Sequence, residues 1–206
     1  LTSFGMRDAA EKAGAKFILG NSSNKPDKEI QLLDSYISQK VDAIVISPVS
    51  SKSSAAGLNR AASKGIKIVM TNSTIEGDAP AAFIESDQTE LGTKTGAAAA
   101  KHIQEKLGGK AKIGILAYKS LLPEQSGARV SGFKQEMAKL PGVQIVVEQD
   151  SWLKENAIKK AGDILTANPD IDMLWSANEG GTVGSVLAVK NAGKAGKVVV
   201  FGTDVS

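Results

Sequence analysis

The 206-residue sequence contains no cysteine, and aromatic residues make up only 4% of it. The absence of thiols excludes disulfides, thiolate nucleophiles and cysteine-ligated zinc. The one histidine, His102, stands alone in a predicted helix, so the sequence offers no metal-ligand spacing. No apolar run is long enough to span a membrane. The 25 basic and 22 acidic residues are scattered, which gives little support to a nucleic-acid partner.

Sequence motifs of catalysis and of cofactor binding are also missing. No G-x-x-x-x-G-K-[ST] loop follows a predicted strand, and the lysines of NAGKAGK come after a helix, where a phosphate would meet the negative end of the helix dipole. GGTVG does not fit G-x-G-x-x-G, and no G-x-S-x-G elbow is present. The sequence therefore predicts a protein that is not an enzyme and that uses no cofactor and no metal.

What the sequence does contain is a regular alternation of buried strands and helices, rich in alanine and glycine. Helix-length connections between buried strands require parallel pairing, so we expect an α/β fold with two doubly wound parallel-sheet lobes. We place the break between the lobes near residues 85–89, which gives lobes at 1–86 and 87–206. The predicted strands are 16–20, 41–47, 66–72, 81–86, 112–118, 143–149, 172–178 and 197–204; the predicted helices are 1–15, 26–39, 53–64, 90–107, 124–139, 153–167 and 181–192.

Small polar residues follow almost every predicted strand. The run VDAIVIS at 41–47, for example, continues into PVSS. Ser50 and Ser53 there suit a helix-capping role, as does Ser22 after the first predicted strand. Capping does not account for Trp152, which also follows a strand. Because ligands bind at the carboxyl ends of parallel strands, this pattern predicts a cleft that hydrogen-bonds a polyhydroxylated or similarly polar small molecule.

Several segments, in order along the chain, carry a family resemblance: GMRDAAEKAGA, VDAIVISP, FIESDQTELG, GARVSGF, SANEG and VVVFGTD. With these segments the chain resembles the type I periplasmic solute-binding proteins of the ribose-binding class, whose fold is shared by the effector domains of LacI-type repressors. The resemblance implies the solute-binding component of an ABC transporter, which holds a sugar or related polar molecule between two lobes. It further implies delivery to a membrane permease or chemoreceptor, a monomer, and a bacterial location that is periplasmic or extracellular and lipid-anchored.

An alternative remains open at this level, because the same fold serves as the ligand-sensing effector domain of LacI-type transcription repressors. A helix-turn-helix encoded before Leu1 would favour the repressor, whereas a signal peptide or a lipid-attachment motif would favour transport. The family's first strand is expected before Leu1 and its last crossovers beyond Ser206, so the expected fold lacks both of them.

In the second lobe the resemblance assigns four ligand contacts. It implies that Arg129 holds sugar hydroxyls, that Trp152 stacks on the sugar ring, that Asn178 makes a polar contact and that Asp204 supplies an acceptor carboxylate.

Three of these residues also have plain structural alternatives. Arg129 could form an ion pair with Glu124 or Glu136, Asp204 could cap a helix, and Trp152 could pack on the surface of its lobe.

In the first lobe the resemblance implies two further contacts, Asn72 and the hinge-side residue Ser86. Many sugar binders carry an aspartate–arginine pair where this sequence has Asn72 and Ser73, so no particular sugar follows from the resemblance. Elsewhere in the chain, Trp175, Tyr118 and Phe83 are expected in the core.

Overall fold

The computed structural model describes residues 2–73, 75 and 77–203. The chain divides into two compact units, Leu1–Ser86 (the first unit) and Asp87–Ser206 (the second unit). None of the helices within the described ranges is both long and apolar enough to cross a lipid bilayer.

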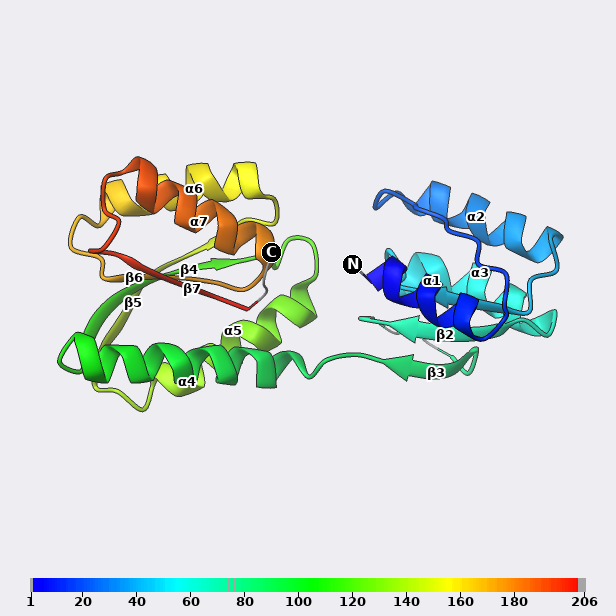
Figure 1. Cartoon of the computed structure of the whole chain (residues 1–206), viewed down its shortest axis with the longest axis horizontal. Helices are drawn as coiled ribbons and strands as arrows, with labels where there is room; N and C mark the ends of the chain where they lie inside the picture. Colours follow the sequence, from blue (N-terminus) through cyan, green and yellow to red (C-terminus); the bar gives the residue numbers. More distant parts are fainter. Residues whose placement is uncertain (1, 74, 76, 204–206) are drawn as a thin grey trace. The chain divides into compact units, whose positions relative to one another are not determined.

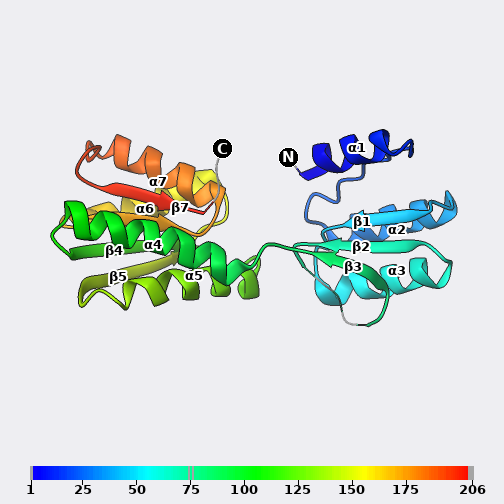
Figure 2. The same cartoon turned by 60° about the horizontal axis from the view of Figure 1, so that its bottom comes forward.

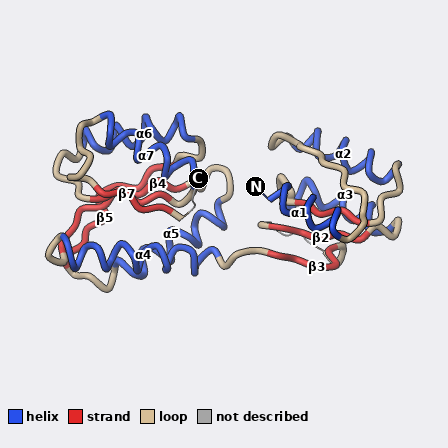
Figure 3. Tube along the Cα trace, in the orientation of Figure 1, coloured by secondary structure: helices blue, strands red, loops and turns tan. Residues whose placement is uncertain are grey.

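The second unit is a parallel four-stranded sheet between two pairs of helices. Its strands pair in the order β5-β4-β6-β7. Helices α4 and α5 cover one face of the sheet, and α6 and α7 cover the other (Figures 1 and 3). The elements are α4 (Gln88–Lys106), β4 (Lys110–Ala117), α5 (Pro123–Met137), β5 (Gly142–Asp150), α6 (Lys154–Ala167), β6 (Met173–Ser176), α7 (Glu179–Asn191) and β7 (Val199–Gly202).

The central strand β4 explains why helices pack on both faces, because its side chains alternate between two apolar clusters. Ile113 and Ile115 belong to the cluster formed with α4 and α5, whereas Leu116 belongs to the cluster formed with α6 and α7. In the first cluster, Trp175 stacks on Phe133 with 4.3 Å between ring centroids. Trp175 is fully buried and Tyr118 is 1% exposed, which confirms both as core residues.

The first unit contains a smaller parallel sheet in the order β1-β2-β3 (Figure 2). Its buried cluster joins Leu33 of α2 and Leu58 of α3 to Ile44, Ile68 and Met70 of the strands. The prediction of two parallel α/β lobes is thus confirmed. The elements of this unit are α1 (Thr2–Lys12), α2 (Pro26–Ser38), β1 (Ala43–Ile46), α3 (Ser51–Ser63), β2 (Lys67–Thr71) and β3 (Pro80–Ile84).

Two expectations for the first unit are wrong. Residues 16–20 form no strand, and Ile18 and Leu19 within them are exposed. An apolar run becomes a strand only when a neighbour completes its backbone hydrogen bonds, and within the described residues no strand pairs with this segment. Phe83 is 41% exposed because β3 is an edge strand whose residues 81–84 are all exposed.

Candidate ligand-binding site

The hydroxyl-rich loop after β1 turns out to stabilise the first unit. The side chain of Ser50 caps α3 by accepting hydrogen bonds from two backbone N–H groups of the first turn, which confirms the capping prediction for this residue. The same segment contacts Glu29 of α2, which is only 4% exposed. The Glu29 carboxylate accepts the backbone N–H of Val49 at 2.8 Å and the hydroxyl of Ser54. The cluster that ends this strand therefore holds a buried carboxylate in place.

Arg129 lies in α5 and reaches the edge of the second-unit sheet at which its strands end, called here the carboxyl edge. Its Nη1 donates to the carbonyl oxygen of Ala177 at 2.8 Å and to Oγ1 of Thr203 at 3.3 Å, and its Nε donates to Oε1 of Gln88 at 2.7 Å. Ala177 and Thr203 directly follow β6 and β7. The guanidinium is thus anchored at the ends of two strands.

The aromatic rings of Tyr118 and Trp152 extend this arrangement along the carboxyl edge. The Arg129 guanidinium lies 5.6 Å from the centroid of the Tyr118 ring, within cation–π range. Tyr118 in turn meets Trp152 edge-on, with 5.3 Å between centroids and 61° between the ring planes. Trp152 is 36% exposed, so part of its ring remains open to solvent. A cation and a partly exposed aromatic side chain therefore both contact one buried tyrosine.

Asn178 fixes the backbone beside these rings. Its Oδ1 accepts the N–H of Gly181 at 3.1 Å and so caps α7, while its Nδ2 donates to the carbonyl oxygen of Trp152 at 2.9 Å. The residue is 6% exposed. These two bonds give Asn178 a part in orienting the Trp152 loop, and its predicted direct contact with a ligand stays a prediction.

Ionised groups next to the carboxyl edge pair with one another. Glu148 of β5 forms ion pairs with Lys119, which follows Tyr118 in the chain, and with Lys134 of α5. Burial acts to raise the pKa of Glu148, but hydrogen bonds from the two ammonium groups outweigh it and hold the pKa below its usual value. The stability that this carboxylate contributes is therefore present above its unfolded pKa and is lost as the pH falls through its folded pKa.

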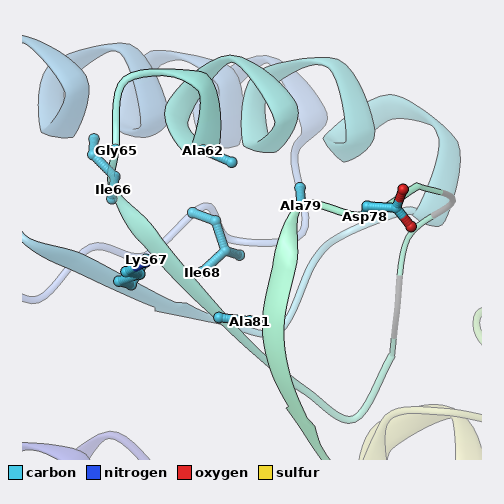
Figure 4. A pocket seen from close by; sticks show the side chains of 8 residues that line it. All are labelled: Ala62, Gly65, Ile66, Lys67, Ile68, Asp78, Ala79 and Ala81. Carbon is cyan, nitrogen blue, oxygen red and sulfur yellow. The ribbon is translucent and has the colours of Figure 1, made fainter.

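A pocket of about 230 Å³ lies elsewhere, in the first unit, at the amino ends of β2 and β3 (Figure 4). Most of the residues that line it are alanine, glycine or isoleucine, and Lys67 and Asp78 are the charged ones. It contains none of the predicted site residues. Among the described residues, no group of three histidines or carboxylates is placed to hold a metal ion.

Residues 3–206 match the family model described as the periplasmic binding protein domain. The chain belongs to the periplasmic binding protein family. This confirms the resemblance drawn from the sequence segments.

Two curated members of the periplasmic binding protein family, both from Escherichia coli K12, illustrate the relationship. The ABC transporter periplasmic-binding protein YphF is 30% identical over 98% of this chain and 63% of its own length. The D-allose-binding periplasmic protein is 31% identical over 97% of this chain and 66% of its own length. The chain thus spans slightly less than two thirds of either relative.

Solved structures of other periplasmic binding proteins share the fold. A solute-binding protein from Actinobacillus succinogenes with bound D-allose aligns with a TM-score of 0.82 and 28% identity, over 95% of this chain and 69% of that one. The arabinose-transporter component from Shewanella sp. ANA-3, bound to L-arabinofuranose, aligns with a TM-score of 0.84 and 26% identity, over 97% and 68% of the two chains.

The structure brings only some of the predicted site residues together. Arg129, Trp152 and Asn178 come together at the carboxyl edge of the second unit. Ser86 is exposed where the first unit ends, and Asn72 is exposed just after β2. Asp204 lies outside the described residues. The roles of all six in ligand binding stay predictions.

Asn72 has a left-handed backbone, with φ of 62°, which makes a sharp test of its side chain possible. Asn72→Gly should keep the stability of the first unit, because glycine adopts this conformation freely, whereas Asn72→Ala should cost about 1 kcal/mol. If the amide contacts the ligand, both variants should weaken binding equally. Urea denaturation combined with sugar titration separates the two effects. Full binding by Asn72→Gly would remove Asn72 from the site.

Sequence reasoning missed Gln88 and the role of Tyr118. Both touch the Arg129 side chain, and neither belongs to a motif that names a ligand contact. The glycines of α4 and α5 were a usable indication. Glycine destabilises a helix interior, so several glycines there suggest that another backbone approaches too closely for a Cβ atom.

Proposed function

We propose that this protein is the solute-binding component of an ABC transporter, which binds a sugar or polyol and delivers it to a membrane permease. We further propose that it acts as a monomer in the bacterial periplasm or, when attached to lipid, at the outer surface of the cell. Membership of the periplasmic binding protein family supports this proposal. Relatives named as D-allose-, xylitol- and ribose-binding proteins support it as well.

The observation that carries the proposal is the contact chain Arg129–Tyr118–Trp152 at the carboxyl edge. A sugar ring has apolar C–H faces and a rim of hydroxyl groups. The exposed part of Trp152 suits such a face, and a guanidinium suits the rim because hydrogen bonds from a charged donor to hydroxyl oxygens are strong. The arrangement therefore fits a small polyhydroxylated molecule better than a flat apolar one.

We expect Arg129→Ala to weaken sugar binding by roughly ten- to a hundredfold, since hydrogen bonds to charged groups contribute about 1.5–3 kcal/mol each. Trp152→Ala should also weaken binding, whereas Trp152→Phe should retain most of it because the flat face remains. The ligand panel is D-allose, D-ribose, D-xylose, xylitol, L-arabinose and myo-inositol. A thermal-shift screen selects the sugars that bind, and calorimetric titration gives their dissociation constants.

Arg60→Ala is the matched control for loss of an arginine, because Arg60 is an exposed α3 residue whose guanidinium pairs with Asp34. It should leave sugar affinity unchanged. Wild-type affinity in both Arg129→Ala and Trp152→Ala would show that the site is wrongly placed. A panel in which no sugar stabilises the protein would contradict the proposed ligand class.

A further inference from the structure

Gln88 is the first residue of α4, directly after the capping residue Asp87. It is only 9% exposed, and its side-chain oxygen accepts the Nε–H of Arg129 at 2.7 Å. Hydrogen bonds to a charged donor are shorter and stronger than those between neutral groups. A buried glutamine thus binds the one guanidinium N–H that lies nearest the aliphatic stem of Arg129.

The close approach of α4 and α5 brings these two side chains together. A Cβ atom on Gly92, one turn after Gln88, would lie closer than 3.0 Å to the carbonyl oxygen of Arg129. A Cβ atom on Gly132 would lie equally close to the carbonyl oxygen of Thr89. The two helices therefore touch backbone to backbone around the residues in question, and only glycine permits this.

Hydrogen bonds at two different nitrogens help to fix the plane of the Arg129 guanidinium. Gln88 holds Nε, and the carbonyl oxygen of Ala177 holds Nη1 on the far side of the group. Because the guanidinium is planar, bonds at these two nitrogens determine how it lies against the Tyr118 ring. An arginine anchored in this way loses less side-chain freedom when it binds a ligand.

We propose that Gln88 is a positioning residue for the ligand site, acting through Arg129 and without contacting the ligand itself. The inference rests on the proposed function of Arg129. As a neutral acceptor, Gln88 orients the guanidinium through Nε without itself neutralising the positive charge. A carboxylate at position 88 would hold the same N–H and would also pair with that charge.

The test is a double-mutant cycle on the full chain with D-allose as the probe. Gln88→Met keeps the length of the side chain but removes the acceptor, and it should weaken binding about tenfold. In an Arg129→Ala background the same change should alter affinity by less than about twofold, because its effect passes through Arg129. Gln88→Glu should restore at least part of the lost affinity. Gln104→Met, an exposed glutamine of the same helix, is the matched control and should bind normally.

A second readout needs no sugar. Hydrogen exchange at the Arg129 Nε–H, followed by NMR, should be faster in Gln88→Met than in the unmodified chain and slow again in Gln88→Glu. Unchanged exchange would overturn the positioning role whether or not D-allose binds.

The outcomes separate the two proposals. If Arg129→Ala weakens D-allose binding but Gln88→Met does not, this inference is wrong and the proposed function stands. If Gln88→Met weakens binding equally with and without Arg129, Gln88 acts by another route and the inference is again wrong. If Arg129→Ala binds normally, the proposed site fails, and the exchange measurement alone decides whether Gln88 positions Arg129.

Discussion

Gly132→Ala is expected to destabilise the second unit by roughly 2–3 kcal/mol, in the upper part of the range for overpacking a close contact. The added methyl group would press on the Thr89 carbonyl oxygen and on the backbone nitrogen of Thr93. Neither can move away without separating α4 from α5. The fluorescence of Trp175, which is buried against Phe133, reports unfolding of this unit in a urea titration.

Gly127→Ala is the matched control for this prediction. Gly127 lies in the same helix, and a Cβ atom there would have nothing within 4 Å. Since alanine is the better helix former, the control should raise stability by about 0.5–1 kcal/mol. Equal urea midpoints for the two variants would show that the close approach of the helices is not rigid.

The second large effect is expected at Glu29. Glu29→Ala removes the acceptor of the Val49 N–H and the partner of the Ser54 hydroxyl, and should destabilise the first unit by roughly 3 kcal/mol. Glu29→Gln should cost less, because an amide can accept from Val49 and donate to Ser54. Tryptophan fluorescence does not report on the first unit, because both tryptophans lie in the second unit. Hydrogen exchange at the Val49 amide therefore measures the effect.

For comparison, Gln31→Ala changes an exposed residue of the same helix and should leave the Val49 exchange rate almost unchanged. Slow exchange at Val49 in Glu29→Ala would mean that the loop after β1 is held by other contacts.

The sequence predicts the two parallel sheets well because their apolar runs and helical connections are local patterns. It fails at residues 16–20, where the local pattern is that of a strand but pairing depends on what lies beside it. Phe83 fails for a related reason: an apolar side chain on an edge strand is buried only if another element covers it. A local sequence pattern predicts which residues can form a strand, but it does not predict which elements pair with that strand or cover it.

The same distinction applies to the site. The strand ends locate the carboxyl edge, and the family resemblance points to Arg129 and Trp152. Two hydrogen-bond partners of Arg129, Gln88 and Ala177, come from positions 41 and 48 residues away in the chain. Only the packing of α4 against α5 and the order of the strands bring them together. The glycines of the two helices suggest that α4 packs closely against α5, but no sequence motif predicts this packing.

The position of β4 has a consequence for synthesis of the chain. β4 is made before the other three strands of its sheet, yet it lies between β5 and β6. Ribosomes add about 5–20 residues per second, so the roughly 60 residues between the end of β4 and the end of β6 take ~3–12 s to appear. During that interval the apolar run of β4 lacks at least one of its two neighbours. We therefore expect the nascent second unit to depend most on chaperones between the synthesis of β4 and the synthesis of β6.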